Sequence, residues 1–178
     1  SELGDIIGRE AAMITMAEGV IYWHMGENDK ALPRFEDSLS KLEELGDERE
    51  VANTLRVIGN VHMTKSDYDQ ALHYYRMGMA MSEKVGDQFA LSSCLNNMGA
   101  VNSILGQLDS AQEFLTRSLE IQEKMGDKQG VGISYNNIGT IFCRSPKKRS
   151  CKCVIDYDNS PVIPGNFYNS CSIGNYQH

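Results

Sequence analysis

The chain has 178 residues, 41% of them hydrophobic and 23% charged, which is the composition of a soluble folded protein and not of a disordered one. A formal net charge of −7 argues against nucleic acid as a partner, because phosphate recognition needs a basic face. No apolar run approaches the ~20 residues of a membrane-spanning helix, and no signal peptide opens the sequence, so we expect a cytoplasmic protein that does not insert into membranes.

Residues 1–7 precede the regular part of the sequence. The chain does not begin with Met, and Leu3-Gly4-Asp5 matches the phrase Leu45-Gly46-Asp47. We interpret residues 1–7 as the end of a preceding repeat or an expression remnant, and the chain as a fragment of a longer array.

An internal repeat with a period of 40 residues runs from residue 8 to residue 144. Four glycines recur at this spacing, as does a column of large residues. The small column is Gly19, Gly59, Gly99 and Gly139, and the large column is Phe35, Tyr75 and Leu115. The predicted units are residues 8–47, 48–87 and 88–127, followed by a lone helix at 128–144.

Each unit is predicted to be a pair of helices. In the second unit, apolar residues at helical spacing predict a first helix over Ala52–Lys65 and a second over about Tyr68–Val85. Ser66-Asp67 supplies a turn and a capping residue between them. The second helix should stop at Gly86-Asp87, where glycine accepts the left-handed conformation and Asp caps the next helix.

The small and large columns predict how the helices pack. Glycine lets two helix backbones approach closely, and the large residues fill the space between hairpins. A bulky residue at Gly99 should therefore overpack the contact and destabilise the array.

The motif resembles that of the tetratricopeptide-repeat family. The matching residues are Gly19, Tyr22, Gly26, Ala31, Phe35 and Ser38 in the first unit, Ile58, Gly59, Ala71, Tyr75 and Gly78 in the second, and Leu95, Gly99, Gly106, Ala111 and Ser118 in the third. The usual period is about 34 residues. The 40-residue variant is similar to the repeats of Pins/LGN polarity adaptors and of kinesin light chains, including the phrases Asn97-Met98-Gly99 and Asn137-Ile138-Gly139. The resemblance implies an all-α, right-handed superhelical solenoid of antiparallel helix pairs, with about 3.5 repeats.

Such a solenoid presents its first helices on a concave surface, which is the candidate peptide-binding groove. Asparagine can donate and accept hydrogen bonds to a peptide backbone, and arginine can pair with an acidic side chain. The predicted groove residues are Met16, Trp23, Asn53, Arg56, Asn60, Asn96, Asn97 and Asn136. Two alternatives stay open: the asparagines solvate an exposed helix face, and Trp23 serves hairpin packing. The family's carboxylate clamp for chaperone tails is matched only at Asn97.

No catalytic or metal-binding constellation stands out. His24, His62, His73 and His178 are not spaced as metal-ligand pairs, and the glycines are periodic instead of forming a phosphate-binding loop. The sequence therefore predicts neither an enzyme nor a cofactor.

Residues 145–178 break the repeat. Pro146 should end the helix that begins near Gln129. Three interpretations remain: a disordered extension, a strand pair formed by Cys153–Tyr157 and Asn166–Ile173, and a zinc site. The zinc ligands would be Cys143, Cys151, Cys153 and Cys171, although the Cys-x-Cys spacing is tighter than usual.

The functional prediction is a scaffold that binds a peptide or helical segment of a partner protein in the concave groove. One alternative is self-association through the apolar ends of the array. The other is a sensory module that regulates an attached domain.

Overall fold

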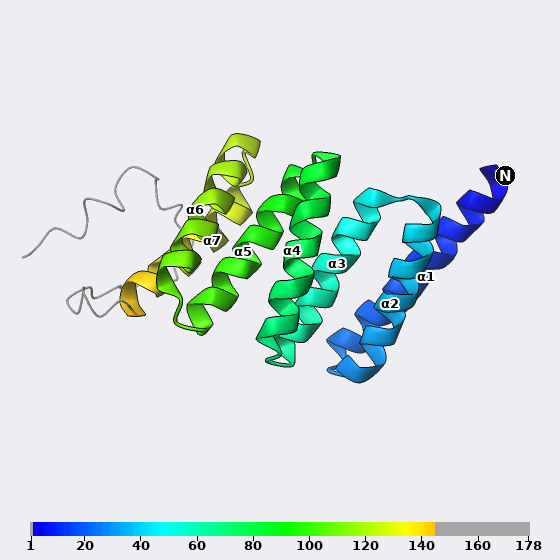
Figure 1. The fold of residues 1–178 in the computed structure, drawn as a ribbon, viewed down its shortest axis with the longest axis horizontal. Coiled ribbons are helices and arrows are strands. Elements are labelled where there is room, and N and C mark those ends of the chain that lie inside the picture. The colour runs from blue at the N-terminus through cyan, green and yellow to red at the C-terminus, as the bar shows by residue number, and fades with distance from the viewer. Residues whose placement is uncertain (1, 145–178) are drawn as a thin grey trace, which may run out of the picture.

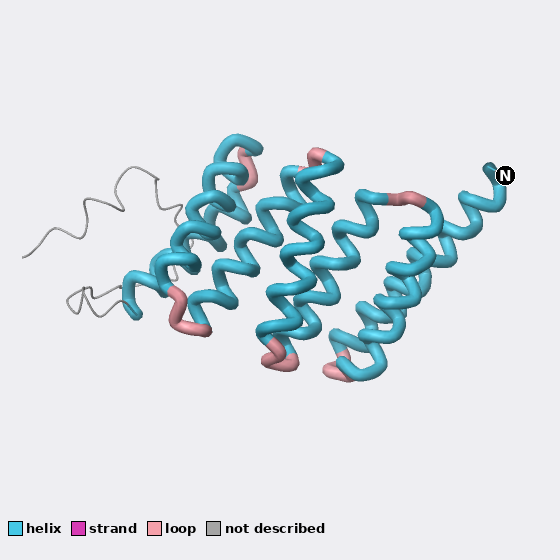
Figure 2. The backbone as a smooth tube through the Cα atoms, in the orientation of Figure 1, coloured by secondary structure: helices cyan, strands magenta, loops and turns pink. Residues whose placement is uncertain are grey.

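A computed structural model describes residues 2–144, and in this range the chain forms seven helices and no strand (Figures 1 and 2). They are α1 (Glu2–His24), α2 (Asn28–Leu45), α3 (Glu48–Thr64), α4 (Tyr68–Val85), α5 (Gln88–Ile104), α6 (Leu108–Met125) and α7 (Lys128–Arg144). The predicted all-α repeat solenoid is confirmed. The strand pair and the zinc site predicted for the C-terminal segment lie outside the described residues.

The limits predicted for the two helices of the second unit can be compared with those of α3 and α4. Helix α4 has the predicted limits, whereas α3 begins four residues before the predicted Ala52. Residues 2–7, which we interpreted as the end of a preceding repeat or an expression remnant, are the first turns of α1, so Gly4 and Asp5 lie inside a helix. For this reason α1 has 23 residues, against 17 for α3.

The Gly-Asp pair between units works as predicted. Gly86 ends α4 with a φ of 73°, and the carboxylate of Asp87 accepts a hydrogen bond from the backbone N–H of Ala90 at 3.0 Å. Asp47 and Asp127 make the same contact with Glu50 and Gly130. The predicted cap at the other turn is wrong, because the side chain of Asp67 makes no capping hydrogen bond to α4.

The helices form two layers, one of first helices (α1, α3, α5 and α7) and one of second helices (α2, α4 and α6). Each helix packs most extensively on its neighbours in sequence. Beyond these, α3 contacts α5 and α5 contacts α7 more extensively than any two second helices contact each other. The layer of first helices is therefore on the inner side of the curve.

The core is built from the small and large columns. A Cβ placed on Gly59 would lie 2.6 Å from the ring of Tyr75, and one on Gly99 would lie 2.5 Å from Leu115. Both large side chains are fully buried. Because no side chain fits at these glycines, the two helices of each hairpin are held in close contact.

Candidate protein-binding surface

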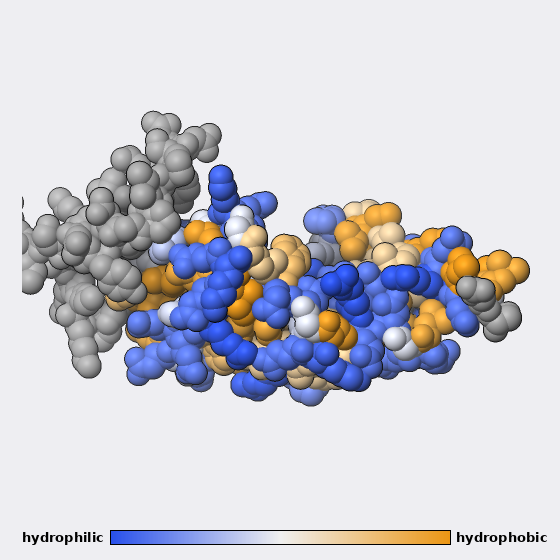
Figure 3. All heavy atoms as spheres, turned by 90° about the horizontal axis from the view of Figure 1, so that it is seen from above, coloured by the Kyte–Doolittle hydropathy of each residue, from blue (hydrophilic) through white to orange (hydrophobic). Residues whose placement is uncertain are grey.

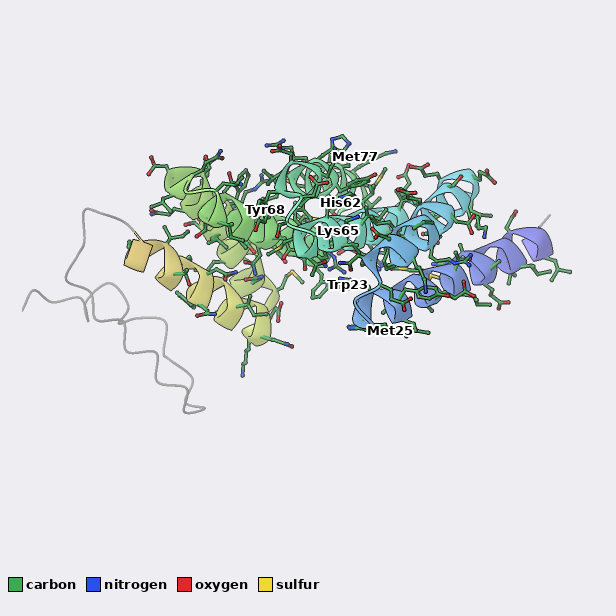
Figure 4. All side chains as sticks on the ribbon, turned by 90° about the horizontal axis from the view of Figure 1, so that it is seen from below. Trp23, Met25, His62, Lys65, Tyr68 and Met77 are labelled. Carbon is green, nitrogen blue, oxygen red and sulfur yellow. The ribbon has the colours of Figure 1, made fainter. Side chains whose placement is uncertain are left out.

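The candidate surface is the inner face of α1, α3, α5 and α7, and we call it the first-helix surface. Seen from below, Trp23 lies on this side of the molecule, whereas Met77 on α4 lies on the opposite side (Figure 4). The eight residues predicted for the groove come from all four of these helices. Their individual environments differ, and the differences decide what the surface can do.

Asn53 and Arg56 form a polar pair on α3. The guanidinium of Arg56 donates to the side-chain oxygen of Asn53 at 2.7 Å, and both side chains are half-buried. Among the described residues, no carboxylate lies within 4 Å of Arg56, whereas most of the other described Lys and Arg side chains are in ion pairs. Arg56 is thus a positioned cation whose charge is not neutralised nearby.

A hydrogen-bonded group joins α3 to α4 and α5. The side-chain oxygen of Asn60 accepts from the hydroxyl of Tyr75 and from the amide of Asn97, both at 2.8 Å. Burial raises the pKa of Tyr75 well above its usual value, so this hydroxyl stays protonated and remains a donor. Asn60 and Asn97 are therefore hydrogen-bonded to each other, so fewer of their side-chain donors and acceptors are available to bind a peptide.

The same kind of bond joins α5 to α7. Asn96 is 8% exposed, and its side-chain oxygen accepts from the amide of Asn137 at 2.7 Å. Asn136 is the exposed member of the predicted set on α7. Of the predicted asparagines, Asn60 and Asn97 therefore bond to each other and Asn96 bonds to Asn137, which was not predicted, while Asn136 stays accessible.

Met16 does not belong to the surface, and this prediction needs correction. Its side chain is 8% exposed and is part of the core cluster with Phe35 and Ile58. The hydroxyl of Thr54 points to its sulfur at 4.0 Å, because α3 packs over this side of α1.

Trp23 packs partly in the core and partly at the surface. It is partly buried against the same core cluster, and its indole N–H donates to the hydroxyl of Thr64 at 3.2 Å. Its ring also stacks on His24, with centroids 5.5 Å apart. Packing between α1 and α3 is therefore its main role.

Sequence reasoning missed Tyr75 and Asn137 as members of the polar network. A signal for Asn137 was present, since it lies 40 residues after Asn97 and both belong to an Asn-x-Gly phrase. The tyrosine hydroxyl carried no such signal, because the neighbouring units have Phe35 and Leu115 in its place.

The structure describes the thiol of Cys94 and shows no metal-ligand group among the described side chains. Cys94 is completely buried, and this burial raises the pKa of its thiol to about 12, although Arg56 opposes the shift. Among the side chains of residues 3–142, no three His, Cys, Asp or Glu are grouped so that they could hold a metal ion. None of the described helices is long and apolar enough to cross a membrane.

Two family models, both described as tetratricopeptide repeat, match residues 10–84 and 91–125, which together make up more than half of the chain. The chain belongs to the tetratricopeptide-repeat family. Such repeats mediate protein–protein interactions, and the fold is typically a non-enzymatic interaction module. A search of curated proteins found no significant match.

Solved structures with tetratricopeptide-like folds superpose well on the chain. BtubC from P. vanneervenii has a TM-score of 0.67 at 22% identity over 74% of this chain and 55% of its own. Aspartyl phosphate phosphatase F from Bacillus subtilis has a TM-score of 0.72 at 14% identity over 75% of this chain and 35% of its own. The tetratricopeptide-repeat domain of Arabidopsis FLU has a TM-score of 0.62 at 20% identity over 66% and 98%, respectively. The chain thus spans about half of the first and a third of the second, and the likeness is one of fold.

Proposed function

We propose that the first-helix surface binds a peptide or helical segment of a partner protein, and that Arg56 pairs with an acidic side chain of that segment. The observation that supports the proposal is the half-buried guanidinium of Arg56, which is held by Asn53 and has no described carboxylate within 4 Å. An arginine held in this way binds a carboxylate with little loss of side-chain freedom.

The surroundings of Arg56 provide the rest of the site. The exposed amide of Asn136 on α7 and the partly exposed Asn53 on α3 can bond to a peptide backbone. The bonds Asn60–Asn97 and Asn96–Asn137 hold neighbouring first helices together and so give the surface its shape. The expected ligand is therefore a segment with at least one Asp or Glu and with free backbone groups.

The test is selection of binders from a random peptide library, followed by affinity measurement on the whole chain. We expect the selected peptides to be enriched in Asp and Glu. Arg56→Glu should weaken their binding about tenfold or more, because it removes a charge-assisted hydrogen bond and adds a like charge. The matched control is Arg76→Glu, an exposed arginine on α4 in the other layer, which should leave binding unchanged.

The result that contradicts the proposal is equal binding of the peptides to wild type and Arg56→Glu. If Arg56→Glu binds more weakly, unchanged circular dichroism of both variants excludes a loss of fold as the cause.

A further inference from the structure

One row of the first-helix surface has an apolar side chain at each end and polar side chains between them. Its members share one position of the 40-residue repeat, one on each first helix. They are Met13 on α1, Asn53 on α3, Ser93 on α5 and Ile133 on α7. In the space-filling view, hydrophobic atoms gather at the end of the array that α1 forms, and hydrophilic atoms predominate towards its middle (Figure 3).

This position of the repeat stays accessible when other units are present on both sides. Asn53 belongs to α3, which contacts α1 and α5, and Ser93 belongs to α5, which contacts α3 and α7. Both side chains are nevertheless half-buried and not buried. The exposure of Met13 (41%) and Ile133 (47%) is therefore a property of this repeat position and not only of the ends of the described array.

Arg56 connects the polar middle of the row to the proposed function. Its guanidinium donates to the side-chain oxygen of Asn53 at 2.7 Å, so the cation lies beside the row. Among the first helices, α3 is next to the helix of Met13 and two helices away from that of Ile133. A ligand that pairs with Arg56 and covers both apolar residues must therefore have unequal spacings on the two sides of its acidic residue.

The spacing of the helices converts this arrangement into a ligand sequence. Packed helices lie about 10 Å apart, and an extended peptide advances about 3.3 Å per residue. The acidic residue should therefore be about three residues from the side chain that covers Met13 and about six from the one that covers Ile133. A helical ligand, which advances about 1.5 Å per residue, would need about 20 residues to span the same distance.

From these observations we infer that the first-helix surface takes an extended segment of a partner protein with two apolar side chains, one about three residues before or after an acidic residue and one about six residues on its other side. The inference rests on the proposed function, because the acidic residue is the one that pairs with Arg56. Met13 and Ile133 then decide which acidic segments bind, because an apolar side chain contributes most when a ligand covers it.

The experiment extends the peptide selection on the whole chain, with peptides of at least about ten residues so that they reach across the row. We expect the selected peptides to contain the two apolar residues at the unequal spacings. Met13→Asn and Ile133→Ser introduce the residues that α3 and α5 have at this position, and each should weaken binding about fivefold or more. The two losses should multiply in the double variant, because the residues are far apart. The matched control is Met77→Asn, since Met77 is 40% exposed on α4 in the other layer and should leave binding unchanged.

A second measurement tests the register. Deleting two residues between the acidic residue and the distant apolar residue leaves that residue short of Ile133, because an extended chain cannot stretch further. We expect the shortened peptide to bind as weakly as a full-length peptide with alanine in place of the distant apolar residue. Ile133→Ser should not weaken binding of the shortened peptide any further.

Three results would overturn the inference while the proposed function holds. They are binding that needs Arg56 but is unchanged in Met13→Asn and Ile133→Ser, selected peptides without the two apolar residues, and apolar residues at spacings of three and four, which indicate a helical ligand. A failure of the proposed function looks different and removes both proposals, since Arg56→Glu then binds the peptides as well as wild type does. Unchanged circular dichroism of each variant shows that weaker binding is not a loss of fold.

Discussion

Within each hairpin, the packing of the two helices depends most directly on the glycine of the small column in the first helix. Gly59 faces the ring of Tyr75 so closely that a Cβ at this position would collide with the ring. Gly139 has the equivalent place in α7, yet no described atom lies within 4 Å of a Cβ built on it. The two residues share a sequence column and differ only in what packs against them.

We therefore expect Gly59→Ala to lower the free energy of unfolding by about 1–3 kcal/mol, because the new methyl group collides with the buried Tyr75 ring. The matched control, Gly139→Ala, should be neutral or raise stability by up to about 1 kcal/mol through helix propensity. Urea unfolding followed by circular dichroism measures both. Equal destabilisation by the two substitutions would show that the packing partner does not decide the need for glycine at these positions.

At the scale of the helices, the two kinds of turn begin the next helix differently. The turns within units lead into α2, α4 and α6 without a side-chain cap, whereas the turns between units end in Asp47, Asp87 and Asp127, whose carboxylates cap the first helices. Asp87 also pairs with Arg49 at 3.1 Å, and the arginine side chain is 70% exposed.

Replacing Asp87 separates these two contributions. Asp87→Ala removes the cap and should lower the free energy of unfolding by about 1 kcal/mol. Asp87→Asn keeps a capping oxygen and loses only the exposed ion pair, so its cost should be a few tenths of a kcal/mol. The same urea titrations measure the difference, and a larger loss for Asn than for Ala would contradict the capping role.

The helices could be predicted from the sequence because hydrophobic spacing and the Gly-Asp phrase are local signals that recur every 40 residues. The limits of α4 and the caps of the first helices followed from them. The environment of the site residues could not be predicted in the same way. The burial of Met16 and the bonds of Asn60 with Tyr75 and Asn97 depend on how neighbouring units are rotated, which no single unit encodes.

For the whole molecule, the distribution of burial predicts how stability is distributed. Helix α5 lies between α4, α6 and the neighbouring first helices, and most of its residues from Ala90 to Ser103 are buried. Helix α1 has an exposed outer face, and α7 packs on described residues from one side only. In a repeat array each unit is stabilised mainly by its direct neighbours, so the middle is protected most.

Hydrogen exchange should show this gradient. Backbone amides of α3, α4 and α5 are expected to exchange most slowly and those of α1 and α7 faster, because helices with described neighbours on one side only can open without disrupting the rest. Mass spectrometry of exchanged peptides measures the rates. Uniform protection from α1 to α7 would indicate a single cooperative unit instead.

The bonds between first helices give the array an uneven stiffness. The amide pair Asn60–Asn97 joins α3 to α5, where Met63 also packs with Met98 and Val101, and the pair Asn96–Asn137 joins α5 to α7. Helices α1 and α3 share an apolar cluster through Val20 and Val57, but their backbones are in less extensive contact than those of α3 and α5. Under a bending force the array should therefore behave as a spring that yields first between α1 and α3, so that its curvature adjusts mainly in its N-terminal half.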